Sequence, residues 1–124
     1  MREETVHYLN KKEEALVHLL TALGINKNVA SVLVFLAGTP EATSRDIEHG
    51  TGLRQPEISV AVKHLIGRGW IRSRPPLPEH TGRRTKVYEL ARPFATIATS
   101  IEKEKKEETD RGLALVKKLH NYLP

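Results

Sequence analysis

The spacing of apolar residues changes at Gly69, and this change constrains the fold more than any other feature of the sequence. In residues 55–67 apolar side chains recur every three or four positions, as on one face of a helix. Residues 70–74 are short and compatible with a strand, and residues 85–90 alternate polar and apolar side chains. The turn-rich segment 77–84 separates them. A helix followed by a β-hairpin is therefore predicted in this half of the chain.

Longer helical patterns flank this region on both sides. Residues 3–23 carry a stripe of apolar side chains and are predicted to form one helix. Asn26 suits the N-cap of a second, almost entirely apolar helix, which residues 38–40 end. A last helix, charged in its middle, is predicted over residues 93–121.

A short helix and a tight turn are predicted immediately before residues 55–67. Thr43 followed three residues later by Asp46 resembles a capping box, which marks the start of a helix. The glycines in residues 50–52 end that helix, and Pro56 stands in the first turn of the next, where proline is tolerated.

Together these elements predict a mainly α fold with a small β-hairpin, namely a winged helix-turn-helix with added N- and C-terminal helices. A chain of 124 residues is expected to form a single domain. Within it we assign residues 1–23 to an N-terminal packing or dimerisation helix, residues 24–92 to the winged helix-turn-helix, and residues 93–124 to a C-terminal dimerisation helix.

The positive charge is concentrated in the middle of the chain. Residues 45–92 hold ten Lys and Arg against five acidic residues, whereas the net charge is −1 before this segment and +1 after it. A localised excess of this kind indicates a polyanionic partner.

Several function classes are disfavoured by the sequence. The chain has no cysteine, which removes disulfides and thiolate chemistry, and its six histidines form no metal-binding motif. No nucleophile elbow, phosphate-binding loop or dinucleotide turn is present, so we expect neither an enzyme nor a cofactor. The longest apolar run, residues 32–37, is too short to span a bilayer, and the charged N-terminus favours a cytoplasmic location.

The segment from Ser44 to Ile71 resembles the DNA-reading part of the ArsR, MarR and archaeal TrmB-type regulators. Residues 53–59, Leu-Arg-Gln-Pro-Glu-Ile-Ser, are similar to an ArsR-type start of the recognition helix, and residues 23–26 are similar to the TrmB-type entry. This resemblance implies a transcription regulator that binds double-stranded DNA. The alternative that stays open is a winged helix that binds other proteins within a larger assembly.

The candidate DNA-binding residues lie opposite the apolar face of helix 55–67 and on the hairpin. Gln55 is placed to pair with adenine and Lys63 to contact a phosphate. The resemblance implies that an arginine near the wing tip, Arg83 or Arg84, enters the minor groove. The full candidate set is Ser44, Arg45, Arg54, Gln55, Pro56, Ser59, Val60, Lys63, Arg72, Arg74, Arg83, Arg84 and Lys86.

The flanking helices carry apolar stripes that a bare winged helix would not need. We expect them to form a homodimer, which would space two recognition helices about one turn of DNA apart. The candidate interface residues are Val6, Leu9, Leu16, Leu20, Phe94, Ile97, Ile101, Leu115 and Leu119.

Overall fold

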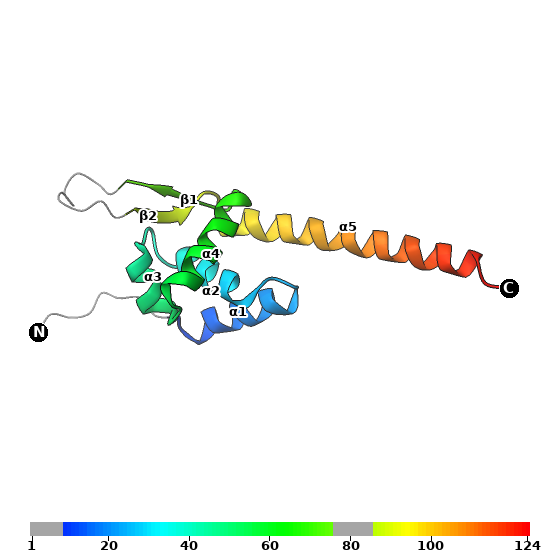
Figure 1. The fold of residues 1–124 in the computed structure, drawn as a ribbon, viewed down its shortest axis with the longest axis horizontal. Coiled ribbons are helices and arrows are strands. Elements are labelled where there is room, and N and C mark those ends of the chain that lie inside the picture. The colour runs from blue at the N-terminus through cyan, green and yellow to red at the C-terminus, as the bar shows by residue number, and fades with distance from the viewer. Residues whose placement is uncertain (1–8, 76–85) are drawn as a thin grey trace, which may run out of the picture. The chain divides into compact units, whose positions relative to one another are not determined.

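The computed structural model describes residues 9–75 and 86–124. It divides into two compact units, Met1–Pro93 and Phe94–Pro124. In the first unit the elements are α1 (Lys11–Ala22), α2 (Lys27–Ala37), α3 (Ser44–Thr51), α4 (Gln55–Gly67), β1 (Ile71–Arg74) and β2 (Val87–Leu90). The second unit is one helix, α5 (Phe94–Asn121) (Figure 1). This order confirms the predicted mainly α winged helix fold.

The apolar helix α2 is the centre of the first unit. Its residues 29–36 are all buried, and it contacts α1, α3, α4 and β2. The predicted cap is confirmed, because the Asn26 side chain accepts hydrogen bonds from the backbone N–H groups of Asn28 and Val29. A helix that is apolar on every side is stable in water only when neighbours cover it all round.

The helix α1 is shorter than the predicted helix 3–23, which is therefore wrong at residues 9 and 10. Asn10 is extended and caps α1: its side chain accepts from the backbone of Glu13, whose carboxylate accepts from the backbone N–H of Asn10. A full capping box fixes a helix start more firmly than apolar spacing does. Residues 3–8 of the predicted helix lie outside the described residues.

The predicted helix start and turn around α3 are confirmed, except that Gly50 lies within α3. Thr43 and Asp46 form the expected reciprocal capping box at the start of α3. Gly52 ends the helix with φ of 78°, in the left-handed region that glycine adopts without strain. This turn sets the direction in which α4 leaves α3.

A matched pair of glycine substitutions tests this turn. Gly52→Ala should lower the free energy of unfolding by about 1 kcal/mol through backbone strain alone, since no atom lies within 4 Å of an added Cβ. Gly67→Ala, at an open position in the last turn of α4, should instead raise it by up to about 1 kcal/mol. Urea unfolding measures both, and two changes of the same sign would contradict the assignment.

The two strands pair antiparallel, with Ile71 opposite Leu90 and Arg74 opposite Val87. A further bridge joins Ala42, between α2 and α3, to Tyr88 of β2, with N–O distances of 3.0 and 2.7 Å. Trp70, which is 4% exposed, starts the wing from within the core. These links attach the base of the wing to the helical core at both strands.

Candidate nucleic-acid interface

The helix α4 buries one face and exposes the opposite one. Ile58, Ala61, Val62 and Leu65 are buried, as the helical period predicts. The N-terminal turn is held by the carboxylate of Glu57, which accepts a hydrogen bond of 2.9 Å from the backbone N–H of Arg54. The start of α4 is therefore fixed, and the first two turns of its opposite face are exposed.

One flank of α4 and the wing enclose a hollow of about 350 Å³. Polar and basic residues from three separate elements meet there: α3, α4 and the wing. It is lined by Ser44, Gln55, Ile58, Ser59, Val62, Lys63, Ile66, Ser73, Lys86 and Tyr88. Five of the thirteen predicted DNA-binding residues are thus brought together, namely Ser44, Gln55, Ser59, Lys63 and Lys86. We call this group the α4–wing cluster.

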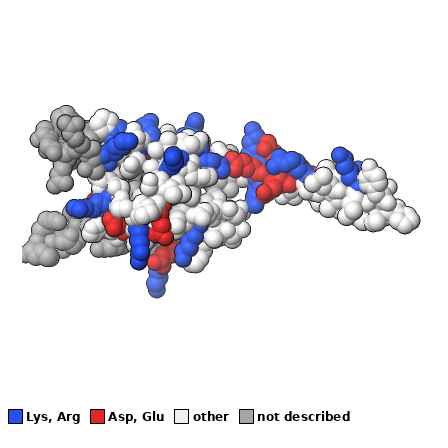
Figure 2. Space-filling model, in the orientation of Figure 1, with Lys and Arg blue, Asp and Glu red and all other residues white. Residues whose placement is uncertain are grey.

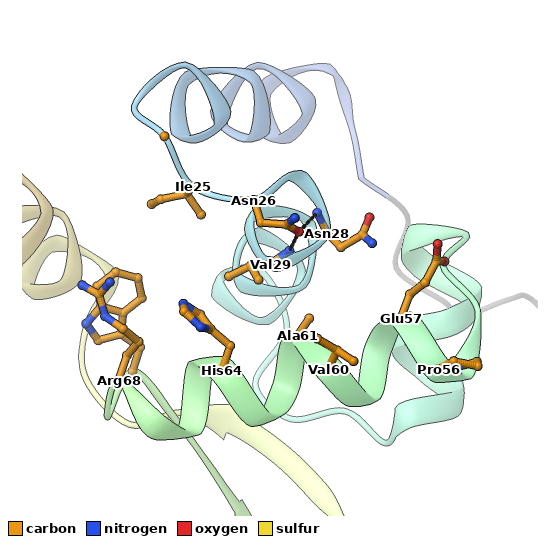
Figure 3. A pocket seen from close by; sticks show the side chains of 12 residues that line it. Ile25, Asn26, Asn28, Val29, Pro56, Glu57, Val60, Ala61, His64 and Arg68 are labelled. Atoms are coloured by element: carbon orange, nitrogen blue, oxygen red, sulfur yellow. Dashed lines mark hydrogen bonds between the residues drawn. The ribbon is translucent and has the colours of Figure 1, made fainter.

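The other flank of α4 borders a second hollow, of about 730 Å³, between this helix and the start of α2. Figure 3 shows Val60, Ala61 and His64 along α4, facing Asn26, Asn28 and Val29 across the hollow. Pro56 and Val60, both predicted to face DNA, lie on this side. Arg68 closes one end, with its guanidinium 4.0 Å from the centre of the Trp70 ring. The predicted base-reading face is therefore shared between two flanks of the helix.

The amide of Gln55 is already used inside the protein. Its Nε2 donates to the carboxylate of Glu48 at 3.0 Å and to the backbone oxygen of Ser44 at 3.4 Å, both on α3. Pairing with adenine by both a donor and an acceptor, as predicted from the sequence, would require one of these bonds to break.

Two of the predicted DNA-binding arginines are engaged in ion pairs at the base of the wing. Glu89 accepts from Arg72 Nε at 2.7 Å and from Arg74 Nε at 3.1 Å. Arg74 also pairs with Glu41. The hydrogen bonds from Arg72 and Arg74 hold the pKa of Glu89 below its ordinary value of 4.5, and the hydrogen bond to Glu89 raises the pKa of Arg74. We therefore infer that the main role of Arg74 is structural, because its ion pairs with Glu41 and Glu89 stabilise the base of the wing.

Acidification should reveal this ion-pair group. Because the folded pKa of Glu89 is depressed, its contribution to stability is present above pH 4.5 and is lost as the pH falls through the folded pKa. Glu89→Gln should unfold at lower urea than the wild type at pH 6, with a difference that shrinks towards pH 3. Glu102→Gln, on the exposed face of α5, is the control. An equal difference at both pH values would contradict the role of Glu89.

The remaining predicted DNA contacts are exposed or lie outside the described residues. Arg45 on α3 and Arg54 at the N-cap of α4 are exposed. Arg83 and Arg84 fall in the segment 76–85, outside the described residues.

The predicted interface residues have unequal exposure. Leu20, Ile97 and Ile101 are buried, and Leu9, Leu16 and Phe94 are half-buried. Leu115 and Leu119 are 65% and 59% exposed. Val6 lies outside the described residues. Figure 2 shows alternating charges along the middle of α5 and a mostly uncharged surface towards its C-terminal end.

Two negative findings concern residues 9–75 and 86–124 only. Within these ranges no three His, Asp or Glu side chains gather in a way that would hold a metal ion. None of the helices in these ranges combines the length and the apolar character needed to cross a membrane.

Glu48 and Tyr88 belong to the site but are absent from the predicted set. Glu48 accepts a hydrogen bond from the side chain of Gln55, and Tyr88 lines the same hollow as the α4–wing cluster. Glu57, which is awkward near DNA as a free acid, is explained by its bond to the helix start. Its position three residues after Arg54 was a signal for this, since an acid at that spacing commonly caps a helix.

The sequence matches the model of the MarR family over residues 23–83. No curated protein sequence matches the chain. The matched segment includes the whole of α2, α3, α4 and β1 and contains Ser44, Gln55, Ser59 and Lys63 of the α4–wing cluster, but it ends before Lys86 and β2.

Solved structures share the fold at low sequence identity. TrmBL2, described as an archaeal chromatin protein, has a TM-score of 0.68 and 18% identity; the match covers 88% of this chain and 39% of that one. A MarR family regulator from Silicibacter pomeroyi has a TM-score of 0.55 and 16% identity over 89% and 79% of the two chains. A mutant MarR from E. coli, solved in complex with operator DNA, has a TM-score of 0.53 and 19% identity over 94% and 89%.

Proposed function

We propose, from the premise that this chain resembles the winged helix-turn-helix regulators of the MarR type, that it regulates transcription by binding double-stranded DNA. The single observation that carries the proposal is the α4–wing cluster, where polar and basic residues of α3, α4 and the wing line one hollow. An α-helix with exposed polar residues in its first turns fits the major groove of DNA.

In this proposal α4 enters the major groove and the wing lies along the backbone or in the minor groove. Ser59 and Val60 lie on the exposed side of α4 and meet base edges, while Ser44, Lys63 and Lys86 contact phosphates. Arg45, Arg54 and Arg72 are exposed and are proposed as further contacts. Arg83 and Arg84 are proposed as wing contacts on the strength of the family resemblance alone.

We further propose that the protein acts as a homodimer through the C-terminal half of α5. Leu115, Val116 and Leu119 recur at helical spacing on α5 and are each at least 48% exposed. A single helix cannot hide such a stripe from water, whereas a second copy of the same helix can. Leu20, Ile97 and Ile101 are already buried, so we leave them out of the proposed contact.

The proposal is tested by titrating a labelled random-sequence duplex with the protein at several salt concentrations. We expect binding that weakens steeply with salt, followed by enrichment of a two-fold symmetric site when binding sequences are selected. Absence of any salt-dependent duplex binding, together with a co-purifying protein partner, would favour the protein-interaction module instead.

A further inference from the structure

The two N–H groups of the Gln55 amide point into the protein, toward α3. They donate to Glu48 at 3.0 Å and to the backbone oxygen of Ser44 at 3.4 Å. Exchanging the nitrogen and oxygen of the amide would place an acceptor against two acceptors, so these partners determine which atom faces α3. The carbonyl oxygen of Gln55 is then the atom left for an outside partner.

We propose that Gln55 reads an amino group on a DNA base, and that Glu48 is the positioning residue that restricts it to this role. The inference rests on the proposed DNA binding, because it concerns the same helix. In the major groove adenine offers the N6 amino group and cytosine the N4 amino group, whereas guanine and thymine present only acceptors to a hydrogen-bonding residue. An acceptor-only glutamine thus favours adenine or cytosine and disfavours the other two bases.

This role differs from the usual pairing of glutamine with adenine. That pairing uses one donor and one acceptor of the amide and singles out adenine. Here the half-buried Glu48 on α3 occupies one N–H donor of the Gln55 amide. Gln55 can then accept a hydrogen bond from adenine or from cytosine. Gln55 is exposed at the first position of α4, where residues of a recognition helix commonly meet base edges.

The test is selection of binding sites from a random duplex library with the full chain and four variants. In the wild type, one position on one strand of each half-site should favour adenine and cytosine over guanine and thymine by about 5-fold, the worth of one hydrogen bond. Gln55→Ala should lose this preference. Glu48→Ala frees the amide, so adenine should gain about 5-fold over cytosine at the same position.

Two further variants separate hydrogen bonding from charge. Glu48→Gln keeps an acceptor beside Gln55 but removes the negative charge, and it should retain the wild-type preference. The double variant Glu48→Ala, Gln55→Ala should have the same base preference as Gln55→Ala alone. It should still bind any duplex more tightly than Gln55→Ala does, because a negative charge has been removed.

The positioning role would be overturned if the wild type preferred guanine or thymine at the position that Gln55→Ala relaxes. It would also be overturned if Glu48→Ala altered base preference equally with and without Gln55. Failure of the wild type to bind any duplex is a different result, because it would refute the proposed function itself.

Discussion

The double variant Lys63→Ala, Lys86→Ala should bind duplex DNA about 60-fold more weakly than the wild type at 0.1 M salt, and about 18-fold more weakly at 0.2 M. Both lysines are exposed and line the α4–wing cluster from opposite elements. If each neutralises one phosphate, their loss lowers the slope of log affinity against log salt by about two. The slope is measured by fluorescence anisotropy titrations across several salt concentrations.

A control pair distinguishes local contacts from net charge. Lys103→Ala, Lys106→Ala removes the same total charge from exposed positions on α5. We expect this pair to leave the slope nearly unchanged, because the proposed interface includes no residue of α5 and the slope reports the number of phosphates contacted. Equal losses in the two double variants would show that the α4–wing cluster does not contact the phosphates.

The double variant Leu115→Glu, Leu119→Glu should convert a dimer into a monomer. Light scattering should give a mass near twice 14.0 kDa for the wild type and near 14.0 kDa for the variant. Affinity for a two-fold symmetric site should fall by roughly 100-fold or more, since the second half-site is no longer bound within one complex. Four charges placed in one apolar contact between two copies cannot be buried without a large cost.

The control for this variant is Ala114→Glu. Ala114 is exposed on the same helix, and helical spacing places it on the side away from Leu115, Val116 and Leu119. It should remain dimeric and bind DNA as the wild type does. A wild type that is monomeric at micromolar concentration would contradict the dimer directly, whatever the variants do.

Local features of the fold were predictable because their causes lie within a few residues. The caps at Asn26 and Thr43, the turn at Gly52 and the bounds of α4 each depend on neighbours at most four positions away. Apolar spacing then identified the buried face of α4, including Ile58 and Leu65. The error at the start of α1 arose where a local capping box at Asn10 competed with a longer apolar pattern.

The candidate site was only partly predictable for the opposite reason. The sequence shows that residues 45–92 are basic and that Gln55 begins the helix 55–67. It does not show that Arg74 pairs with Glu41, 33 positions away, or that Glu48 takes the donors of Gln55. Those partners are chosen by the packing of α3 on α4 and by the attachment of the wing at Ala42.

The sequence by itself determined the order of helices and strands, the caps and the concentration of positive charge, because each follows from short-range spacing or from counting. Only the tertiary structure decided which charges remain open to a partner and which are neutralised inside the chain. An ion pair or a side-chain hydrogen bond depends on distances of about 3 Å between residues far apart in the chain, and folding alone sets those distances. At Gly69, where the apolar spacing changes, the sequence indicates a wing. The fold determines which charged side chains of that wing are paired within the chain and which remain available to a partner.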